Sequence, residues 1–328
     1  MKPFALWLAC VIALGSPAPA FAYLKFGVRV ATGVVDVRWN RTIPYFVTDR
    51  GVAGVSAEQL RDVVARAFGT WQAAPRTAIQ SQFQGFTTAL PGLQDGRATF
   101  GFLDRPDLDR VLGAASFLLD STTGEILEAD VFFNTRFNWS VAPAGEPGRV
   151  DLESVVLHEI GHVLGLGHSA LGETEMIPGG RRVLASGAVM FPIAFAAGSI
   201  ADRQLQPDDL AGISDLYPAS GFEAATSSIS GRITKNGAGI FGAHVVAVNL
   251  ATGTLVGGFS LNTQGEYAIA GLLPGSYLLR VEPLDDADTD SFFTGPFDPD
   301  FRVTYGSRVV IAPAGGGSDP IDVDVRPK

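Results

Sequence analysis

The sequence predicts an α+β domain followed by a small all-β sandwich. Apolar residues recur at helical spacing in three segments before residue 218, and only short strand-like runs broken by Gly, Pro, Asn and Asp come after it. In between, residues 219–228 are mostly small or polar, which is typical of a linker. The 328 residues allow two domains of ordinary size. We place these domains at residues 23–220 and 228–328, with a linker at 221–227.

Residues 1–22 have the features of a secretory signal peptide. Lys2 precedes an apolar run over residues 4–14, and Ala20-Phe21-Ala22 supplies the small residues of a cleavage site, so we expect cleavage after Ala22 and export. The only cysteine, Cys10, lies inside this segment. Cleavage just before it, as in a lipoprotein, is the less favoured alternative because the preceding apolar stretch is very short. No later segment is long enough to span a bilayer.

Composition narrows the class of partner. The formal net charge of −10 opposes binding to phosphate backbones, so we expect no nucleic acid partner. Hydrophobic residues make up 46% of the chain, enough to form packed cores without disulfides. We expect a monomer.

The elements of the first domain follow in chain order. Ser56 and Gln59 form a capping box at the start of the first helix, which ends before Pro75. Asp151 can cap the second helix, and Pro207 suits the first position of the third. Apolar runs predict strands at residues 43–47, 98–103, 111–118 and 126–133.

The second domain contains strands and turns only. Gly, Pro, Asn and Asp separate its short apolar runs at a spacing that is typical of a β-sandwich. The expected strands are residues 229–233, 243–250, 267–269, 277–281, 308–311 and 321–325.

Residues 157–169, LHEIGHVLGLGHS, fill every fixed position of H-E-x-x-H-x-x-G-x-x-H. Positions i and i+4 of a helix share one face, so His158 and His162 can direct their imidazoles at one cation about 2 Å away. Gly165 accepts the left-handed conformation that ends a helix, and His168 can then return as the third ligand. Three imidazoles leave one tetrahedral position open, which is the arrangement of a catalytic zinc site.

Glu159 follows a ligand but points about 100° away around the helix. We therefore expect it to face a water on the zinc, whose pKa falls to about 7, and to act as the general base. The motif predicts hydrolysis of a peptide bond. A short H-E-x-x-H can arise by coincidence on an amphipathic helix, but Gly165 and His168 at the required spacing argue against that interpretation.

The zinc motif, Met190 within GAVMFP and the segment LQPDDLAGISDLYP together resemble the matrixins, a branch of the metzincin zinc metallopeptidases, over about residues 23–218. Ser169 favours this branch over other metzincins, which are the nearest alternative. The resemblance implies a metzincin-like domain with a mixed twisted sheet and three helices. It also implies an exported metalloendopeptidase that acts on a protein or peptide.

The same resemblance implies supporting roles for several residues. Met190 would form a turn beneath the zinc, and Pro192 would line the pocket for the residue after the scissile bond. Asp208 and Asp209 would tie the third helix to the floor of the site. The strand near residues 111–117 would pair with extended substrate. Its substrate-facing residues would be Gly113, Ala114 and Ala115.

The chain also departs from the matrixin pattern. The second, structural zinc of that family needs further histidines, but only His244 remains, in the second domain, and Phe132 stands where one ligand is expected. We therefore expect one catalytic zinc. No cysteine remains after signal cleavage to block the site. The stretch from His168 to Met190 is longer than in matrixins, and its course is not predicted.

Calcium is usual in matrixins, but here only the acidic turns around Asp120 and Asp130 suggest it. A second acidic stretch begins at Asp286 with the first three spacings of an EF-hand loop. Ser291 and Phe297 occupy its glycine and glutamate positions, so we interpret it as a solvated loop.

Residues 225–328 resemble the carboxypeptidase regulatory-like, transthyretin-like β-sandwich. The segments SISGRITKNGAGIFGAHVVAV, NTQGEY and LLPGSYLLRVEP carry this likeness. Such a domain can contact substrate or a surface, and a stabilising spacer is the equal alternative. His244 has no metal-binding partner at ligand spacing, so we expect it to pack within its strand.

A non-catalytic exported binding protein on a retired protease scaffold is the competing function from another class. The intact Glu159 argues against it, because loss of the base is the simplest way to retire such a site.

Overall fold

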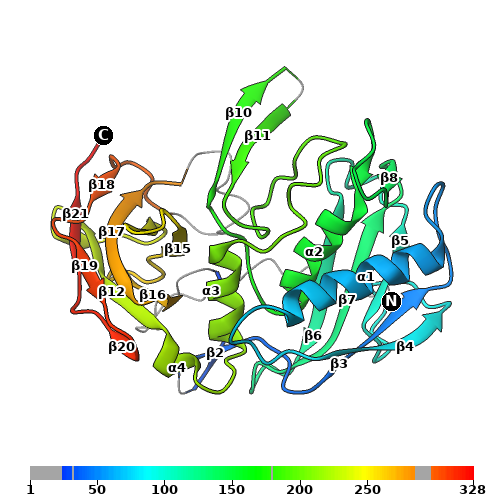
Figure 1. The fold of residues 1–328 in the computed structure, drawn as a ribbon, viewed down its shortest axis with the longest axis horizontal. Coiled ribbons are helices and arrows are strands. Elements are labelled where there is room, and N and C mark those ends of the chain that lie inside the picture. The colour runs from blue at the N-terminus through cyan, green and yellow to red at the C-terminus, as the bar shows by residue number, and fades with distance from the viewer. Residues whose placement is uncertain (1–23, 32, 179, 285–296) are drawn as a thin grey trace, which may run out of the picture.

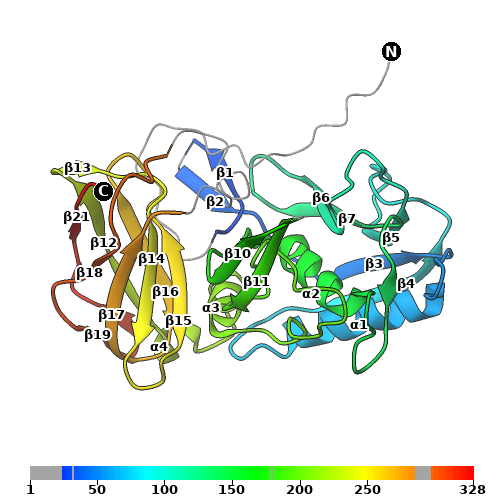
Figure 2. The same cartoon turned by 90° about the horizontal axis from the view of Figure 1, so that it is seen from above.

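The computed structural model describes residues 24–31, 33–178, 180–284 and 297–328. The expected signal peptide and the acidic stretch that begins at Asp286 lie outside the described residues. The described chain forms an α+β domain beside an all-β sandwich (Figures 1 and 2), which confirms the predicted fold class. None of the described helices is long and apolar enough to cross a membrane.

The first domain is built on a five-stranded mixed sheet in the order β4-β3-β5-β7-β6. Its strands are β3 (Ile43–Thr48), β4 (Ser81–Thr87), β5 (Thr99–Leu103), β6 (Gly113–Leu119) and β7 (Ile126–Asn134). The pairs β3–β4, β3–β5 and β5–β7 are parallel. Strand β6 runs antiparallel to β7 at the edge, so one side of β6 remains unpaired within this sheet.

Helices α1 (Ala57–Gln72) and α2 (Leu152–Val163) pack against each other. The predicted capping box is present, because the Ser56 hydroxyl accepts from the Gln59 N–H and the Gln59 side chain accepts from the Ser56 N–H. The Trp71 indole N–H donates to the Leu157 carbonyl at 2.9 Å in the buried contact between the helices. This hydrogen bond fixes α2, which carries the zinc motif, against α1.

The start of α2 is held from two directions. Asp151 accepts from the backbone N–H of Ser154 at 3.0 Å, as its predicted role as N-cap requires. The same buried carboxylate pairs with the Arg203 guanidinium at 2.5 and 2.9 Å, and Arg203 also donates to the Ala142 carbonyl. The motif helix is therefore tied to the segment that leads into the third helix, α3 (Pro207–Leu216).

Several elements of the first domain were not predicted. They are β4 of the main sheet and the shorter β1 (Gly27–Val30), β2 (Gly33–Asp36), β8 (Trp139–Ser140), β9 (Val150–Asp151), β10 (Gly172–Ile177) and β11 (Gly180–Ser186). The β10–β11 hairpin fills the long stretch between His168 and Met190 and stands at the top of Figure 1. Its base is closed by a hydrogen bond from the Gly187 N–H to the Leu171 carbonyl.

The second domain is a sandwich of two five-stranded sheets. One sheet contains β12 (Ser227–Lys235), β13 (Ala238–Gly239), β16 (Glu266–Leu272), β20 (Gly316–Gly317) and β21 (Val323–Val325). The other contains β14 (His244–Asn249), β15 (Leu255–Phe259), β17 (Gly275–Glu282), β18 (Thr304–Tyr305) and β19 (Val310–Ala312). Each of the six expected runs overlaps one of these strands.

The stretch expected to be a linker, residues 221–227, is largely ordered structure. It holds the one-turn helix α4 (Phe222–Ala225), whose Phe222 is buried, and its last residue begins β12. The small, polar composition of this stretch gave no sign of its helical turn or of its buried aromatic side chain. Helix α3 lies on the side of the first domain that faces the sandwich in both views, and one continuous apolar core runs through both domains. The domain boundaries themselves remain a prediction.

Buried carboxylates on β7 hold the loop between β4 and β5. Asp130 accepts from the backbone N–H groups of Gly92 and Thr99 at 2.7 and 2.8 Å, and Glu128 accepts from that of Gly96 at 2.6 Å. Asp120 likewise accepts from Thr122. The carboxylates of both turns that suggested calcium are thus engaged by protein donors, and calcium has no support beyond the resemblance.

The free energy of unfolding should depend on pH through Asp130. Burial raises its pKa from 3.8 to about 7, although the N–H groups of Thr99 and Gly92 oppose this rise. The folded state then keeps a proton that the unfolded chain loses. The resulting stabilisation is complete below about pH 4 and is lost as the pH rises through about 7. We expect the free energy of unfolding, measured with urea, to change less between pH 5 and pH 8 for Asp130→Asn than for wild type. Equal changes in the two proteins would contradict this assignment.

Candidate metal centre

Helix α2 and the turn after it bring together the three predicted zinc ligands. The ligand nitrogens of His158, His162 and His168 all lie within 4.8 Å of one another. The Nε2 atoms of His162 and His168 are 3.2 Å apart. Two ligands of a tetrahedral zinc, each about 2 Å from the ion, would be about 3.3 Å apart. The spacing of these nitrogens therefore fits one zinc ion.

Backbone carbonyls fix two of these histidines in the tautomer that can bind a metal through Nε2. The Nδ1 of His158 lies 2.7 Å from the Val189 carbonyl oxygen, and the Nδ1 of His162 lies 2.8 Å from that of Leu166. A carbonyl can only accept, so each Nδ1 carries the hydrogen and each Nε2 keeps a lone pair for a metal. Burial lowers the pKa of His158 to about 3 and that of His162 well below 6.5, so both rings are neutral. The donor set is the one that zinc requires.

Gly165 turns the chain from the second ligand to the third. It has φ +100°, and its N–H donates to the His162 carbonyl at 2.8 Å just beyond the end of α2. A Cβ at this position would lie 2.0 Å from the Val37 carbonyl oxygen. Both the left-handed backbone and this close approach require glycine.

Glu159 is buried beside the edge strand. The backbone N–H of Ala115 hydrogen-bonds its carboxylate, and a Cβ built on Gly113 would lie 3.3 Å from its Oε1. Its Oε2 is buried and lacks a hydrogen-bond partner within the described part of the chain. Burial raises the pKa of Glu159 to about 8 against the effect of the Ala115 N–H. A cation held by the histidines would favour the charged carboxylate.

The predicted substrate strand therefore lies next to the predicted base. Gly113, Ala114 and Ala115 begin β6, pair with residues 131–133 of β7 and are partly exposed. Because β6 is the edge of the sheet, an extended chain could pair with its free side. The structure thus places the strand that the resemblance implied beside the base that the motif predicted.

Met190 packs directly under α2. It is buried, and its sulfur would lie 2.1 Å from a Cβ on Gly161. Gly161 therefore lets Met190 approach the helix backbone between the two ligand-bearing positions. Gly161 was not among the residues predicted to support the site. The sequence feature that could have indicated it is a glycine inside a helix, where glycine lowers stability by about 1 kcal/mol relative to alanine.

The paired aspartates of α3 hold the turn that carries Met190. Asp209 accepts from the backbone N–H groups of Val189 and Met190 at 2.8 and 3.2 Å. Asp208 accepts from the hydroxyl of Ser169, the residue after the third ligand, at 2.6 Å. These contacts agree with the roles that the resemblance implied for both aspartates.

The remaining residues that sequence analysis singled out lie around the site or away from it. Pro192 is half-buried two residues after Met190. Phe132 is buried, and its ring centre lies 5.2 Å from the guanidinium of Arg105. His244 is buried in β14, and its Nδ1 lies 3.0 Å from Glu282 Oε1.

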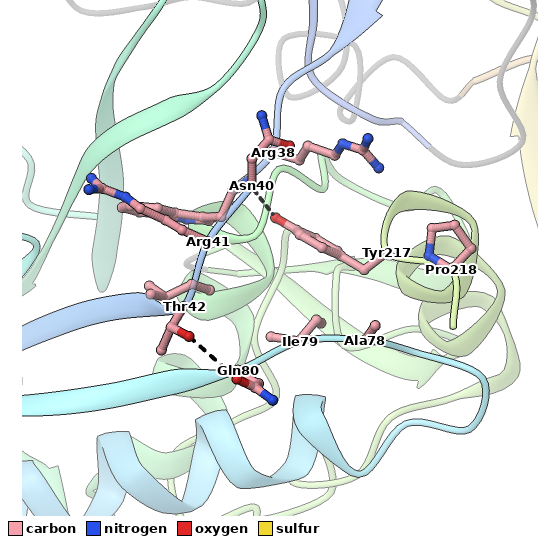
Figure 3. Close-up of a pocket in the computed structure, with 11 residues that line it drawn as sticks. Arg38, Asn40, Arg41, Thr42, Ala78, Ile79, Gln80, Tyr217 and Pro218 are labelled. Carbon is pink, nitrogen blue, oxygen red and sulfur yellow. Dashed lines mark hydrogen bonds between the residues drawn. The ribbon is translucent and has the colours of Figure 1, made fainter. Parts of the chain in front are cut away.

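A separate pocket of about 320 Å³ contains none of the site residues (Figure 3). It lies where residues before β3 meet the end of α3. There the Tyr217 hydroxyl accepts from the Trp39 N–H at 3.0 Å and donates to the Leu164 carbonyl at 2.8 Å. The pocket is lined by residues 38–43, 78–80 and 217–218. Its hydrogen bonds join α3 to the end of α2, so we interpret it as a structural junction.

Gly161→Ala should destabilise the protein by about 1–3 kcal/mol, because the new methyl group overpacks the buried Met190 sulfur. Gly69→Ala, in α1, is the matched control. A Cβ on Gly69 meets nothing within 4 Å, so this change should stabilise the protein by up to about 1 kcal/mol. Measuring the free energy of unfolding of both variants with urea separates the effect of overpacking from the effect of helix propensity. If Gly161→Ala were as stable as Gly69→Ala, the proposed contact with Met190 would be wrong.

Comparisons with known proteins agree with this geometry. A family model described as Matrixin matches residues 38–218, and one described as Carboxypeptidase regulatory-like domain matches residues 228–291. The chain is 32% identical over 182 residues to Metalloendoproteinase 2-MMP of Arabidopsis thaliana, a match that covers 52% of this chain and 40% of that relative. It is 30% identical over 149 residues to Metalloendoproteinase 4-MMP of the same organism, covering 43% and 41%.

The chain thus spans less than half the length of these curated relatives. The family match covers more than half of this chain and includes all three histidines, Glu159 and Met190. The chain therefore belongs to the matrixin family, with a carboxypeptidase regulatory-like domain after its matrixin domain.

Proposed function

We propose that this protein is an exported zinc-dependent endopeptidase. His158, His162 and His168 would hold one zinc ion, and Glu159 would act as the general base. The observation that carries the proposal is the convergence of three imidazoles beside the buried carboxylate of Glu159, two of them on the same helix as Glu159 and fixed through Nδ1 by carbonyl oxygens. Bound zinc supplies a Lewis acid for the scissile carbonyl and lowers the pKa of water to about 7.

Glu159 suits proton transfer because its two oxygens differ. The Ala115 N–H orients the carboxylate, while Oε2 is buried without a partner among the described residues. We assign to this oxygen the proton taken from the attacking water. Glu159 would then pass the proton to the leaving amine. Burial excludes bulk water, which strengthens the electrostatic interactions within the site.

The substrate would bind as an added strand along β6. Its backbone would pair with the free edge at Gly113, Ala114 and Ala115, whose small side chains leave that edge accessible. The contact between β6 and Glu159 supports this placement, because the scissile bond must lie beside the base. On the opposite wall, Pro192 would line the pocket for the residue after the scissile bond.

Export rests on residues 1–22 alone, with cleavage after Ala22. The proposal includes a single zinc per chain, because Phe132, which packs against Arg105, stands where the resemblance places one ligand of a structural zinc. It also includes a site without a cysteine latch, because Cys10 would leave with the signal peptide.

A broad peptide library tests the proposed activity. We expect the zinc-loaded full chain to cleave internal peptide bonds, a metal chelator to abolish cleavage, and added zinc to restore it. Mass spectrometry of the products should also define the residue preferred after the scissile bond. A zinc-loaded protein that cleaves no library member would instead support the retired-scaffold alternative.

A further inference from the structure

We propose that the β-sandwich is a working part of the metal centre rather than a spacer. The backbone N–H of Gly257, in β15, holds the carboxylate of Asp208, which in turn holds Ser169 beside the ligand His168. Gly257 is thus a positioning residue that acts through α3. This inference rests on the zinc site proposed above and concerns the support of that site.

Asp208 is shared between the two domains. Its Oδ1 accepts from the Gly257 N–H at 2.7 Å, and its Oδ2 accepts from the Ser169 hydroxyl at 2.6 Å. The side chain is 2% exposed, so water cannot replace either donor. Withdrawing the sandwich would remove the donor that fixes Oδ1 in its present position. The carboxylate would then rearrange, and its bond to Ser169 would change with it.

Ser169 transmits this contact to the ligand loop. Its N–H donates to the Met190 carbonyl at 2.9 Å, and its hydroxyl also accepts from the Leu171 N–H at 3.2 Å. The residue after His168 is therefore held by the Met190 turn, by α3 and by its own loop. Because His168 follows α2 on a turn rather than within the helix, these bonds set its position more than helix geometry does.

The sandwich approaches α3 at two glycines. A Cβ on Gly257 would lie 2.8 Å from His244 Nε2 and 3.3 Å from Leu171 Cγ. A Cβ on Gly271, which has φ +68°, would lie 2.7 Å from the Ala211 carbonyl oxygen. A side chain at Gly271 would clash with the backbone of α3, and one at Gly257 would press on His244 of the neighbouring strand and on Leu171 of the first domain. Close backbone contact between the domains is therefore built into the sequence.

Zinc release from the full chain tests the proposal. In Gly257→Ala the new methyl group should shift β15 and weaken its bond to Asp208, so we expect zinc to pass to a chromogenic chelator about tenfold faster than from wild type. Gly316→Ala is the matched control in the same domain, because the nearest atom to its Cβ is 3.9 Å away. It should release zinc at the wild-type rate.

A double-mutant cycle then tests whether Gly257 acts on the metal centre through Ser169. Ser169→Ala should also speed zinc release, and Ser169→Thr, which keeps the hydroxyl, should restore the wild-type rate. In the Ser169→Ala background, Gly257→Ala should have little further effect, because both changes break one chain of contacts. Additive effects, or equal release from Gly257→Ala and Gly316→Ala, would overturn the proposal.

Amide hydrogen exchange in the wild-type protein provides a test without any substitution. Coupling is reciprocal, so loading zinc should slow exchange of the Gly257 amide. The Ile321 amide, which donates to the Ser230 carbonyl elsewhere in the sandwich, should change much less. Equal responses of the two amides would contradict the proposal. Both readouts follow zinc and not cleavage, so a coupled protein that cleaves no peptide would refute the proposed activity while supporting this inference.

Discussion

Replacing Glu159 by glutamine is expected to lower kcat for peptide cleavage by about 10³-fold. Glutamine has the same shape and can still accept the Ala115 N–H, but it cannot take a proton from water. Zinc affinity should change little, because Glu159 is not one of the clustered ligands. Steady-state kinetics on a cleaved library peptide, with zinc content measured on the same samples, separate loss of the base from loss of the metal.

Glu153→Gln is the matched control for this experiment. Glu153 lies in the first turn of the same helix and pairs with Arg66, whose side chain is 51% exposed. Loss of such an ion pair should cost at most about 1 kcal/mol of stability and should leave kcat unchanged. If Glu159→Gln retained more than a tenth of the wild-type kcat, Glu159 could not be the general base.

Gly165→Ala should have the largest effect on the structure of the site. The new Cβ would lie 2.0 Å from the Val37 carbonyl oxygen, a backbone atom that cannot simply rotate away, and φ +100° is itself strained for alanine. We expect a loss of about 3–5 kcal/mol in the free energy of unfolding. Zinc affinity should also fall, because the turn between His162 and His168 must open.

The cost of the backbone conformation can be measured separately. Gly148 also has positive φ, +75°, and a Cβ there meets nothing within 4 Å. Gly148→Ala should cost only about 1–2 kcal/mol and should leave zinc affinity unchanged. Urea unfolding and zinc competition on both variants make the comparison. Similar results for the two would mean that the Val37 contact does not constrain the ligand turn.

Local chemistry explains why the helices and the grouping of the three histidines could be predicted. The capping box at Ser56 and the N-cap at Asp151 act within three residues, so the pattern that forms them is visible in the sequence. The ligand set depends on helix periodicity and on one glycine turn. These features are fixed over a dozen residues, and the structure has each of them.

Weakly buried strands could not be predicted in the same way. In β4 the side chains alternate between half-buried and exposed, and most are polar or glycine, so its apolar signal is slight. The β10–β11 hairpin forms its own two-stranded sheet, and Leu184 on it is 52% exposed. Burial on only one side, or on none, leaves little hydrophobic pattern to detect.

Tertiary contacts that involve glycine backbone atoms could not be predicted from the sequence either. Gly161 makes room for Met190, and the Gly257 N–H reaches Asp208, a residue 49 positions away. Neither contact depends on a side-chain pattern. The first needs the absence of a side chain at Gly161, and the second uses the peptide N–H of Gly257. Such contacts become apparent only when the fold has placed the two segments together.

Zinc titration of the metal-free full chain, followed by peptide cleavage, tests the central claim most directly. One zinc held by His158, His162 and His168 predicts no cleavage without metal and a rate that rises linearly and saturates at one equivalent of zinc. Glu159→Gln should bind the same single equivalent and remain inactive. Cleavage by metal-free protein, or saturation only at two equivalents, would contradict the account of one zinc and one glutamate.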